Sequence, residues 1–307
     1  MDVSGAAKGA GSLNGGKAPT TSLKKGTETM AVNLAGDNDE LAKIYDETSE
    51  WQFRNGSYLI EKLGLTPGAA VLDLGCGTGR LGRHVAGLIG PAGSFTGLDP
   101  LEQRIRIANE KNEHRNAAFR IGTAEELGSV ADNSIDVVYL SSVFHWVVDK
   151  EAALREIVRV LKPGGRVGIT TGPKELNGIT GVKAITESVL KREPYRRLVR
   201  VEESSQNRHS LTTTELIQLL VQAGLSVEEI QLRAIKRSYA TAKEFLKRSE
   251  SSAFGNYLGN VPEALHDQVK ADIEAECEKY RGKGGIEFYN HMTFAVARKK
   301  RKLALVS

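Results

Sequence analysis

Three glycines at alternate positions, Gly75, Gly77 and Gly79, directly follow an apolar stretch that contains one acidic residue. With Gly82 they complete a G-x-G-x-x-G pattern, in which a turn without side chains lets a cofactor approach the backbone. Asp99 ends the next apolar stretch, where an acidic side chain accepts hydrogen bonds from the ribose hydroxyls of a nucleoside. These residues predict that a nucleoside cofactor binds over this turn.

Asp73 bears on the kind of cofactor, because it lies inside the apolar stretch just before the first glycine. A dinucleotide places its pyrophosphate on the backbone N–H groups of such a turn, where a neighbouring carboxylate would repel it. A cofactor with an ammonium or sulfonium group would be attracted instead. A phosphate-binding loop would need Gly-Lys-Ser/Thr, whereas residues 79–81 read Gly-Arg-Leu. Asp73 therefore favours a cationic cofactor, with a dinucleotide and a turn without any ligand as the alternatives.

The pattern of apolar runs places this turn in an alternation of strands and helices. We expect strands at residues 69–74, 94–99, 117–121, 134–140 and 166–171. The segments between most of these runs carry apolar residues at helical spacing. This alternation predicts an α/β fold, in which a doubly wound, mostly parallel sheet has helices on both faces. Such sheets bind ligands at the carboxyl ends of their strands, which is where the glycine turn lies.

The chain beyond residue 172 alternates less regularly. Helices are expected within about 173–208 and 241–281, on either side of a sixth strand at 226–235, and a seventh strand at 286–298 closes the pattern. The expected fold is therefore a seven-stranded Rossmann-like sheet in a single domain over residues 36–298. The inserted helices are expected to form a lid over the ligand end of the sheet.

Both ends of the chain differ in composition from the domain between them. Residues 1–35 are rich in Gly, Ser, Thr, Ala and Lys and are expected to be disordered. Residues 299–307 are expected to form a basic tail within a basic run that starts at Arg298. The tail is expected to be a solvated segment, with a localisation signal and a contact to an anionic surface as the alternatives. That run accounts for the net charge of +4. The domain itself is nearly neutral, so no nucleic-acid partner is expected.

The two cysteines, Cys76 and Cys277, form no disulfide framework and indicate a reducing compartment, so we expect a cytoplasmic protein. No apolar run reaches the roughly 20 residues of a membrane span. Side chains that commonly ligate metals are not clustered at ligand spacing, so no metal is expected. The expected partner is a small molecule, and the sequence does not indicate the oligomeric state.

Five motifs in sequence order resemble those of class I S-adenosylmethionine-dependent methyltransferases. They read VLDLGCGTGR at 71–80, GLDP at 97–100, GTAEEL at 122–127, SIDVVYLSSVFHWV at 134–147 and LKPGGRV at 161–167. The branch that the chain resembles contains the ubiquinone/menaquinone, trans-aconitate and malonyl-carrier-protein methyltransferases. The resemblance implies that S-adenosyl-L-methionine is the cofactor. It also implies methyl transfer to a small-molecule acceptor, with O-methylation favoured over C- or N-methylation. A nicotinamide-dependent oxidoreductase and a non-catalytic S-adenosylmethionine-binding subunit are the alternatives.

The same resemblance implies which residues bind the cofactor. The methionine part would lie on the turn, the ribose on the acidic residue after the second strand, and the adenine between the residues that follow. The cofactor-binding residues so implied are Asp73, Gly75, Gly77, Gly79, Asp99, Pro100, Leu101, Thr123, Ala124, Glu125 and Ser141. Thr123 departs from the family, which usually has Asp at this position.

His145 is the candidate catalytic residue, because it follows the fourth strand and its usual pKa of about 6.5 suits proton abstraction. A packing role beside Trp146 is the alternative. Aromatic residues from the first and last thirds of the domain are candidates for the walls of the site: Tyr45, Trp51, Phe53, Tyr58, Phe245, Phe254 and Tyr257. Three arginines are candidates for binding an acceptor carboxylate: Arg196, Arg197 and Arg200.

Overall fold

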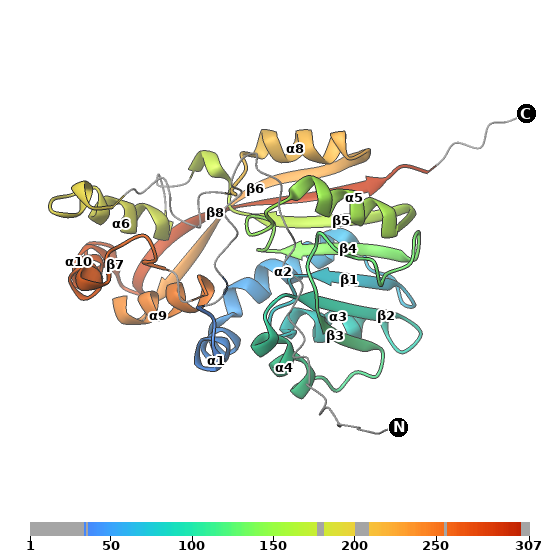
Figure 1. Ribbon diagram of the computed structural model, residues 1–307, viewed down its shortest axis with the longest axis horizontal. Coiled ribbons are helices and arrows are strands. Elements are labelled where there is room, and N and C mark those ends of the chain that lie inside the picture. Colours follow the sequence, from blue (N-terminus) through green and yellow to red (C-terminus); the bar gives the residue numbers. More distant parts are fainter. Residues whose placement is uncertain (1–33, 35, 177–180, 200–208, 255–256, 302–307) are drawn as a thin grey trace, which may run out of the picture. The chain divides into compact units, whose positions relative to one another are not determined.

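The computed structural model describes residues 34, 36–176, 181–199, 209–254 and 257–301. Its strands form one sheet in the order β3-β2-β1-β4-β5-β8-β6, with a short β7 on β8 (Figure 1). The strands are β1 (Ala70–Leu74), β2 (Ser94–Asp99), β3 (Ala117–Ile121), β4 (Ile135–Ser141), β5 (Leu161–Thr171), β6 (Leu225–Tyr239), β7 (Arg281–Gly282) and β8 (Gly285–Lys299).

The strand directions confirm the expected Rossmann-like sheet. Strands β1 to β5 pair in parallel, and β8 runs antiparallel to both β5 and β6. Seven of the strands correspond to the seven that the apolar runs predict. The eighth, β7, is a two-residue strand that turns into β8 at Gly285, whose φ of +100° favours glycine. β5 is longer than the expected strand at 166–171, because Leu161 pairs with Ile135 ahead of an irregularity in the register.

Helices cover both faces of the parallel part of the sheet. The first face carries α2 (Glu50–Leu63), α3 (Arg80–Ile89) and α4 (Glu102–Glu110), and the second carries α5 (Lys150–Val160) and α8 (Thr213–Gln222). Successive side chains of a strand point to opposite faces. Val71 and Tyr139 therefore enter the core under α2 and α3, whereas Leu72 and Val138 enter the core under α5 and α8. This two-sided burial explains why the strands read as continuous apolar runs.

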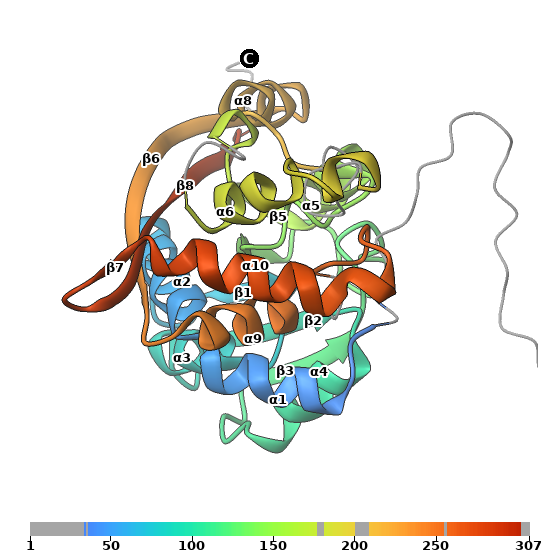
Figure 2. The same cartoon turned by 90° about the vertical axis from the view of Figure 1, so that its left-hand side faces the viewer.

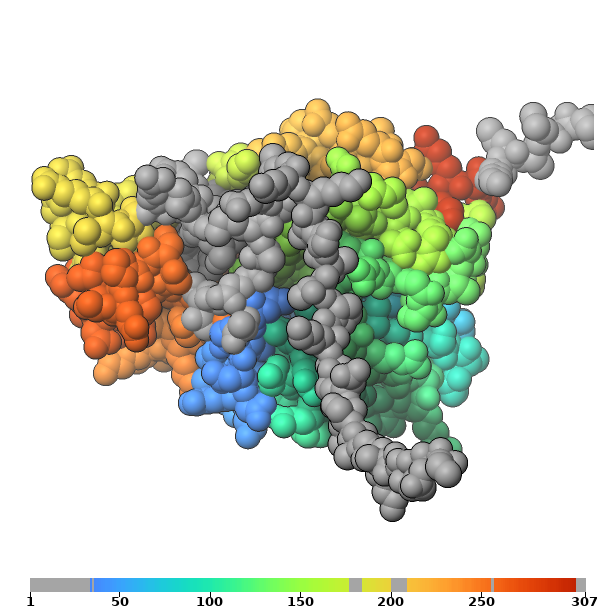
Figure 3. All heavy atoms as spheres, in the orientation of Figure 1, coloured from blue at the N-terminus to red at the C-terminus, as the bar shows by residue number. Residues whose placement is uncertain are grey.

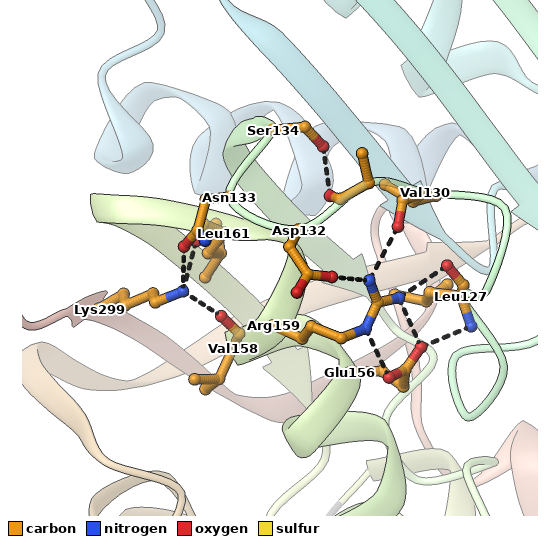
Figure 4. Close-up of polar contacts among 11 residues, drawn as sticks. Leu127, Val130, Asp132, Asn133, Ser134, Glu156, Val158, Arg159, Leu161 and Lys299 are labelled. Atoms are coloured by element: carbon orange, nitrogen blue, oxygen red, sulfur yellow. Dashed lines mark hydrogen bonds and ion pairs between the residues drawn. The ribbon is translucent and has the colours of Figure 1, made fainter.

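Two basic side chains, those of Lys299 and Arg159, donate hydrogen bonds to backbone carbonyl groups near the C-terminal end of α5 (Figure 4). Lys299 at the end of β8 donates to the carbonyls of Val158 and Leu161 at 2.6 and 2.7 Å. Arg159 donates to the carbonyl of Leu127 at 2.8 Å, which holds the loop before β4. Cations are favoured at this end of a helix. Lys299 therefore belongs to the sheet and not to the basic tail expected from residue 299.

A second group of helices lies beyond the parallel strands. Residues 286–292 of β8 pair with β6 and not with β5, so these two strands extend past the rest of the sheet. On this extension pack α6 (Gly181–Leu190), α9 (Ala242–Ser252) and α10 (His266–Glu278), which we call the helical cluster. Figure 2 shows α6, α10, α9 and then α1 (Asp39–Thr48) one below the other, and Figure 3 shows α6 (yellow) directly above α10 (orange).

The helical cluster has an apolar core of its own. Val269, Ile273 and Cys277 of α10 lie in it with no exposed surface, as the apolar stripe of that helix predicts. The described part of the segment 173–208 contains α6 and two short turns, η1 (Lys174–Leu176) and η2 (Tyr195–Arg197). The expected disordered residues 1–35 lie outside the described residues except for Leu34. Among the described residues, none of the helices has the length and apolar character that crossing a membrane requires.

Candidate active site

A cavity of about 510 Å³ opens at the carboxyl ends of the parallel strands and continues under α9 and along β8. Its wall contains all of the predicted site residues except Asp73 and Gly79. Those that line it are Gly75, Gly77, Asp99, Pro100, Leu101, Thr123, Ala124, Glu125, Ser141 and His145. The structure thus brings together residues from the ends of β1, β2, β3 and β4.

The glycine turn after β1 needs glycines for two different reasons. Gly75, Gly77 and Gly79 all have positive φ, of 83°, 55° and 73°, which side chains disfavour. A Cβ on Gly75 would lie 2.3 Å from the Val143 side chain, so this position must be bare for the loop after β4 to approach. Gly79 does not line the cavity. It packs against Ala108 and Phe119 and sets how α3 meets the sheet.

Asp99 at the end of β2 holds the glycine turn in place. One carboxylate oxygen accepts from the Gly77 N–H at 2.8 Å, and the other accepts from the Leu101 N–H at 3.0 Å. The residue is only 6% exposed, and burial raises the pKa of its carboxyl group. Each oxygen retains a lone pair, so the carboxylate can accept further hydrogen bonds from a ligand.

Asp73 lies deeper than Asp99, in a smaller pocket that shares Gly75 and Ser141 with the main cavity. It is 2% exposed and sits opposite Tyr139 in the register of β1 and β4. Burial, with a smaller contribution from the charge of Asp99, raises the pKa of Asp73 to about 8, against the lowering effect of Tyr139. In the described part of the chain no Lys or Arg pairs with it. A cationic ligand beside this buried side chain would favour its ionised form.

His145 lies in the loop after β4, where its ring lines the cavity. Its Nδ1 is 3.5 Å from the Thr171 hydroxyl, and its ring packs on Trp146 with centroids 5.1 Å apart. Trp146 in turn meets the edge of the Phe254 ring at 4.8 Å. Phe254 follows α9 and has a φ of +56°, which is uncommon outside glycine. The loop after β4 and the chain after α9 therefore meet over the cavity.

A buried ion pair between α4 and the segment before α1 also contacts α9 next to these rings. Arg104 of α4 forms a two-bond pair with Asp37 at 3.0 and 3.1 Å and also donates to the Ser251 carbonyl at 3.0 Å. Its guanidinium stacks on Tyr45 at 4.2 Å and on Phe254 at 4.7 Å. Arg104 lines the cavity and was missed in the sequence, because its partners come from two distant parts of the chain, residues 37–45 and 251–254, and no local pattern marks them.

Four of the seven aromatic candidates line the cavity. They are Tyr45, Trp51, Phe254 and Tyr257, of which Tyr45 lies beside Gly77 of the glycine turn. The other three do not: Phe53 packs on His84, Tyr58 on Phe294, and Phe245 lies in the core of the helical cluster.

The basic residue on this wall is not one of the expected arginines. Arg196 and Arg197 both pair with Glu193, are exposed and do not line the cavity, and Arg200 lies outside the described residues. Arg237 of β6 lines the cavity instead. Among the described residues no group of three His, Cys, Asp or Glu side chains is placed to hold a metal ion.

Residues 72–169 match a family model described as a methyltransferase domain. These residues therefore form a class I S-adenosylmethionine-dependent methyltransferase domain. The matched range runs from β1 into β5, so it contains the glycine turn, Asp99 and His145 but not the helical cluster. The family uses S-adenosylmethionine as its methyl donor.

Three relatives show how far the likeness in sequence extends. An arsenite methyltransferase of Aquipseudomonas alcaligenes is 39% identical over 112 residues, which are 34% of this chain and 32% of that protein. A ubiquinone/menaquinone biosynthesis C-methyltransferase of Hahella chejuensis is 36% identical over 126 residues, 40% of this chain and 50% of that protein. A demethylmenaquinone methyltransferase of Staphylococcus aureus is 33% identical over 147 residues, 47% and 59% of the two chains. The chain therefore spans between a third and three fifths of these relatives.

Two solved structures share the fold over most of the chain. The YcgJ protein of Bacillus subtilis superposes with a TM-score of 0.56 and 17% identity, covering 81% of this chain and 99% of its own. The cyclase SpnF superposes with a TM-score of 0.51 and 23% identity, covering 81% of each chain. At these identities the likeness concerns the fold alone.

The donor set of the cavity fits the methyl donor of this methyltransferase family. Asp73 is a buried acidic side chain without a cationic partner in the described residues, and an ammonium or sulfonium group beside it would stabilise its ionised form. Asp99 has free lone pairs at the end of β2, where a ribose would lie. Gly75 and Gly77 line the cavity with backbone atoms alone. These residues present complementary charge and hydrogen-bond acceptors to S-adenosylmethionine.

Proposed function

We propose that this chain transfers the methyl group of S-adenosylmethionine to a small-molecule acceptor, with an oxygen atom favoured as the nucleophile. The observation that carries the proposal is the continuity of the cavity. One end is formed by Asp99 and the glycine turn, the other includes the aromatic side chains of Phe254 and Tyr257, and His145 lies in the wall of this one cavity. Two partners of different chemistry fit such a space together.

The residues of this chain would act mainly by binding and orienting. When bound, S-adenosylmethionine supplies a methyl carbon activated by the positive sulfur. Asp73 would attract the cationic part of the donor, and Asp99 would fix the ribose. The aromatic wall would align the acceptor and exclude water. Positioning of this kind accounts for a large part of the rate of a two-substrate reaction.

His145 would remove the proton that a hydroxyl acceptor loses when its oxygen attacks the methyl carbon. The contact between its Nδ1 and the Thr171 hydroxyl would help to orient the ring in the cavity wall. A neutral imidazole is the form that accepts a proton at neutral pH. An acceptor that attacks as a carboxylate would not need this residue, so the role of His145 also distinguishes between nucleophiles.

The test has two parts, which separate binding from turnover. Titration calorimetry with S-adenosylhomocysteine and with NAD is expected to give binding of the first only. Turnover is then measured as S-adenosylhomocysteine formed from S-adenosylmethionine with a panel of phenols and alcohols. His145→Ala is expected to lower turnover by about 10²- to 10⁴-fold, as for other general bases, with unchanged affinity for S-adenosylhomocysteine. His114→Ala, which lies outside the cavity, is the matched control.

Three outcomes would contradict parts of this proposal. Binding of NAD in place of S-adenosylhomocysteine would favour an oxidoreductase. Binding without turnover on any acceptor would favour a non-catalytic subunit. Turnover that survives His145→Ala would leave the histidine with a packing role beside Trp146.

The location of the protein is also a proposal. Cys76 and Cys277 are both buried and unpaired, which fits a reducing compartment such as the cytoplasm.

A further inference from the structure

We propose that Arg237 binds a carboxylate of the acceptor, so that the methyltransferase acts on aromatic or other largely apolar acids at a second functional group. The inference rests on the proposed function, because it concerns the acceptor half of the same cavity.

The guanidinium of Arg237 lacks the partner that other buried arginines of this region have. It lies over the ring of Trp51 at 4.5 Å and near the ring of Tyr239 at 5.3 Å. Among the described residues no carboxylate pairs with it. By contrast, Arg104 pairs with Asp37, and Arg248 donates to the Thr48 carbonyl and contacts Glu244. Arg237 is thus a cation in the cavity wall without a counterion of its own.

Its surroundings make an unpaired cation costly. Burial, together with the positive charge of Arg248, lowers the pKa of Arg237. A guanidinium that stacks on an indole ring still presents its N–H edge in the plane of the group, and that edge matches the two oxygens of a carboxylate. Filling this position with an anionic ligand would offset the unfavourable desolvation of the arginine. A neutral ligand would not.

Trp51 supplies a second, independent observation. Its indole N–H is buried and has no acceptor among the described residues, although the residue lines the cavity. A buried N–H without an acceptor is unusual. An oxygen of a bound acid is one group that could satisfy it. Arg237 therefore lacks a counterion and Trp51 lacks a hydrogen-bond acceptor, and the oxygens of one bound carboxylate could supply both.

The rest of this wall fits an apolar body attached to the acid. Phe254, Tyr257 and Met292 line the cavity with Arg237. A carboxylate held by both oxygens has its lone pairs engaged and becomes a poorer nucleophile. We therefore place the methylated atom elsewhere on the acceptor, towards His145.

The experiment measures binding of simple acids and of their neutral amides to the full chain saturated with S-adenosylhomocysteine. The probes are 4-hydroxybenzoate, 4-hydroxycinnamate and 3,4-dihydroxybenzoate, each compared with its amide, and phenyl phosphate. We expect the wild type to bind at least one acid about 10- to 100-fold more tightly than its amide, the range for hydrogen bonds to charged groups. Arg237→Met should abolish this preference, and Arg237→Lys should retain part of it.

Arg233→Met is the matched control. Arg233 lies on the same strand, stacks on Tyr58 at 4.0 Å and does not line the cavity, so its loss should leave the preference unchanged. Unchanged affinity of Arg237→Met for S-adenosylhomocysteine would show that the variant is folded. The proposal would be overturned by a wild type that binds no acid better than its amide, by a preference that survives Arg237→Met, or by phenyl phosphate binding more tightly than every acid. Failure of the wild type to bind S-adenosylhomocysteine would instead count against the proposed function.

Discussion

The two ends of the cavity carry side chains of different chemistry and are held by different means. The end at β1 and β2 has the buried acidic side chain of Asp99, with Asp73 in the smaller pocket beside it, and Asp99 is fixed by backbone N–H groups at 2.8 and 3.0 Å. The end at β6 and α9 has a guanidinium, that of Arg237, which rests on aromatic rings at 4.5 and 5.3 Å. One end is therefore held by backbone hydrogen bonds, whereas the other is held by contacts between side chains.

This difference indicates which end of the cavity determines substrate specificity. Backbone hydrogen bonds and bare glycines leave few ways to change the first end without losing the turn. Ring contacts between α2, β6 and the chain after α9 can be altered one side chain at a time. We therefore expect the acceptor end to determine specificity on a constant cofactor end, as functional sites on a shared fold commonly do.

The largest effect is expected where the two ends meet, at the buried pair of Arg104 and Asp37. Their side chains are 4% and 0% exposed. Asp37→Asn leaves a buried guanidinium without its counterion, which we expect to lower the free energy of unfolding by about 3–5 kcal/mol. Urea denaturation followed by circular dichroism measures this. Loss of the pair should also weaken binding at both ends, because Arg104 stacks on Tyr45 and Phe254.

A neighbouring pair provides the control for this prediction. Arg106 and Asp39 also join α4 to the start of α1, at 2.7 Å, but their side chains are 50% and 56% exposed. Exposed pairs contribute at most about 1 kcal/mol, so Asp39→Asn should have little effect. Equal effects of the two substitutions on the free energy of unfolding would mean that the buried pair of Arg104 does not connect the two ends of the cavity.

The next effect concerns the cofactor end alone. An amide at position 99 offers one oxygen where two backbone N–H groups now find acceptors, so Asp99→Asn places its NH₂ against the N–H of Gly77 or Leu101. We expect the Kd for S-adenosylhomocysteine to rise by roughly 10²-fold, the size of one or two lost hydrogen bonds to a charged group. Titration calorimetry measures it, with Glu102→Gln on the exposed side of α4 as the control. A rise below about threefold would contradict the place given to Asp99.

The cofactor end could be anticipated from the sequence because its residues follow the strand ends directly. Gly75 and Asp99 come just after or at the end of apolar runs, and parallel strands bring those ends to one edge of the sheet. Gly79, which is predicted to bind the cofactor, does not line the cavity and lies instead against Ala108 and Phe119, which come from later segments.

The acceptor end could not be anticipated in the same way. Arg237 faces the cavity because of the register of β6 on β8, which pairs it with Phe288 and lays it on Trp51 from another part of the chain. In the sequence it is one of several polar residues that alternate along a strand. Arg196 and Arg197 look equally suitable there, but Glu193 pairs with both. Side-chain contacts between distant segments decide this end, and no local pattern encodes them.

The smallest expected effect is a change in the protonation state of Asp73 when the ligand binds. Because the pKa of Asp73 is raised to about 8, most of the free protein carries this residue protonated at pH 7. An ammonium group bound beside it would favour the ionised form, so binding of S-adenosylhomocysteine at pH 7 should release roughly one proton per site. Calorimetry in two buffers that differ in ionisation enthalpy measures this release, and Asp73→Asn should abolish it.

The raised pKa of Asp73 also determines whether the free energy of unfolding rises or falls with pH. Without ligand the folded state holds the proton on Asp73 more tightly than the unfolded state does, where the pKa is about 3.9. Ionisation therefore opposes folding, and this residue makes the free energy of unfolding fall as the pH rises from about 4 towards 8. Asp73→Asn should be less sensitive to pH over this range. Proton release that is the same in the variant, together with an unchanged slope of stability, would place the cationic part of the ligand away from Asp73 and would leave Asp99 as the acidic residue that distinguishes the two ends.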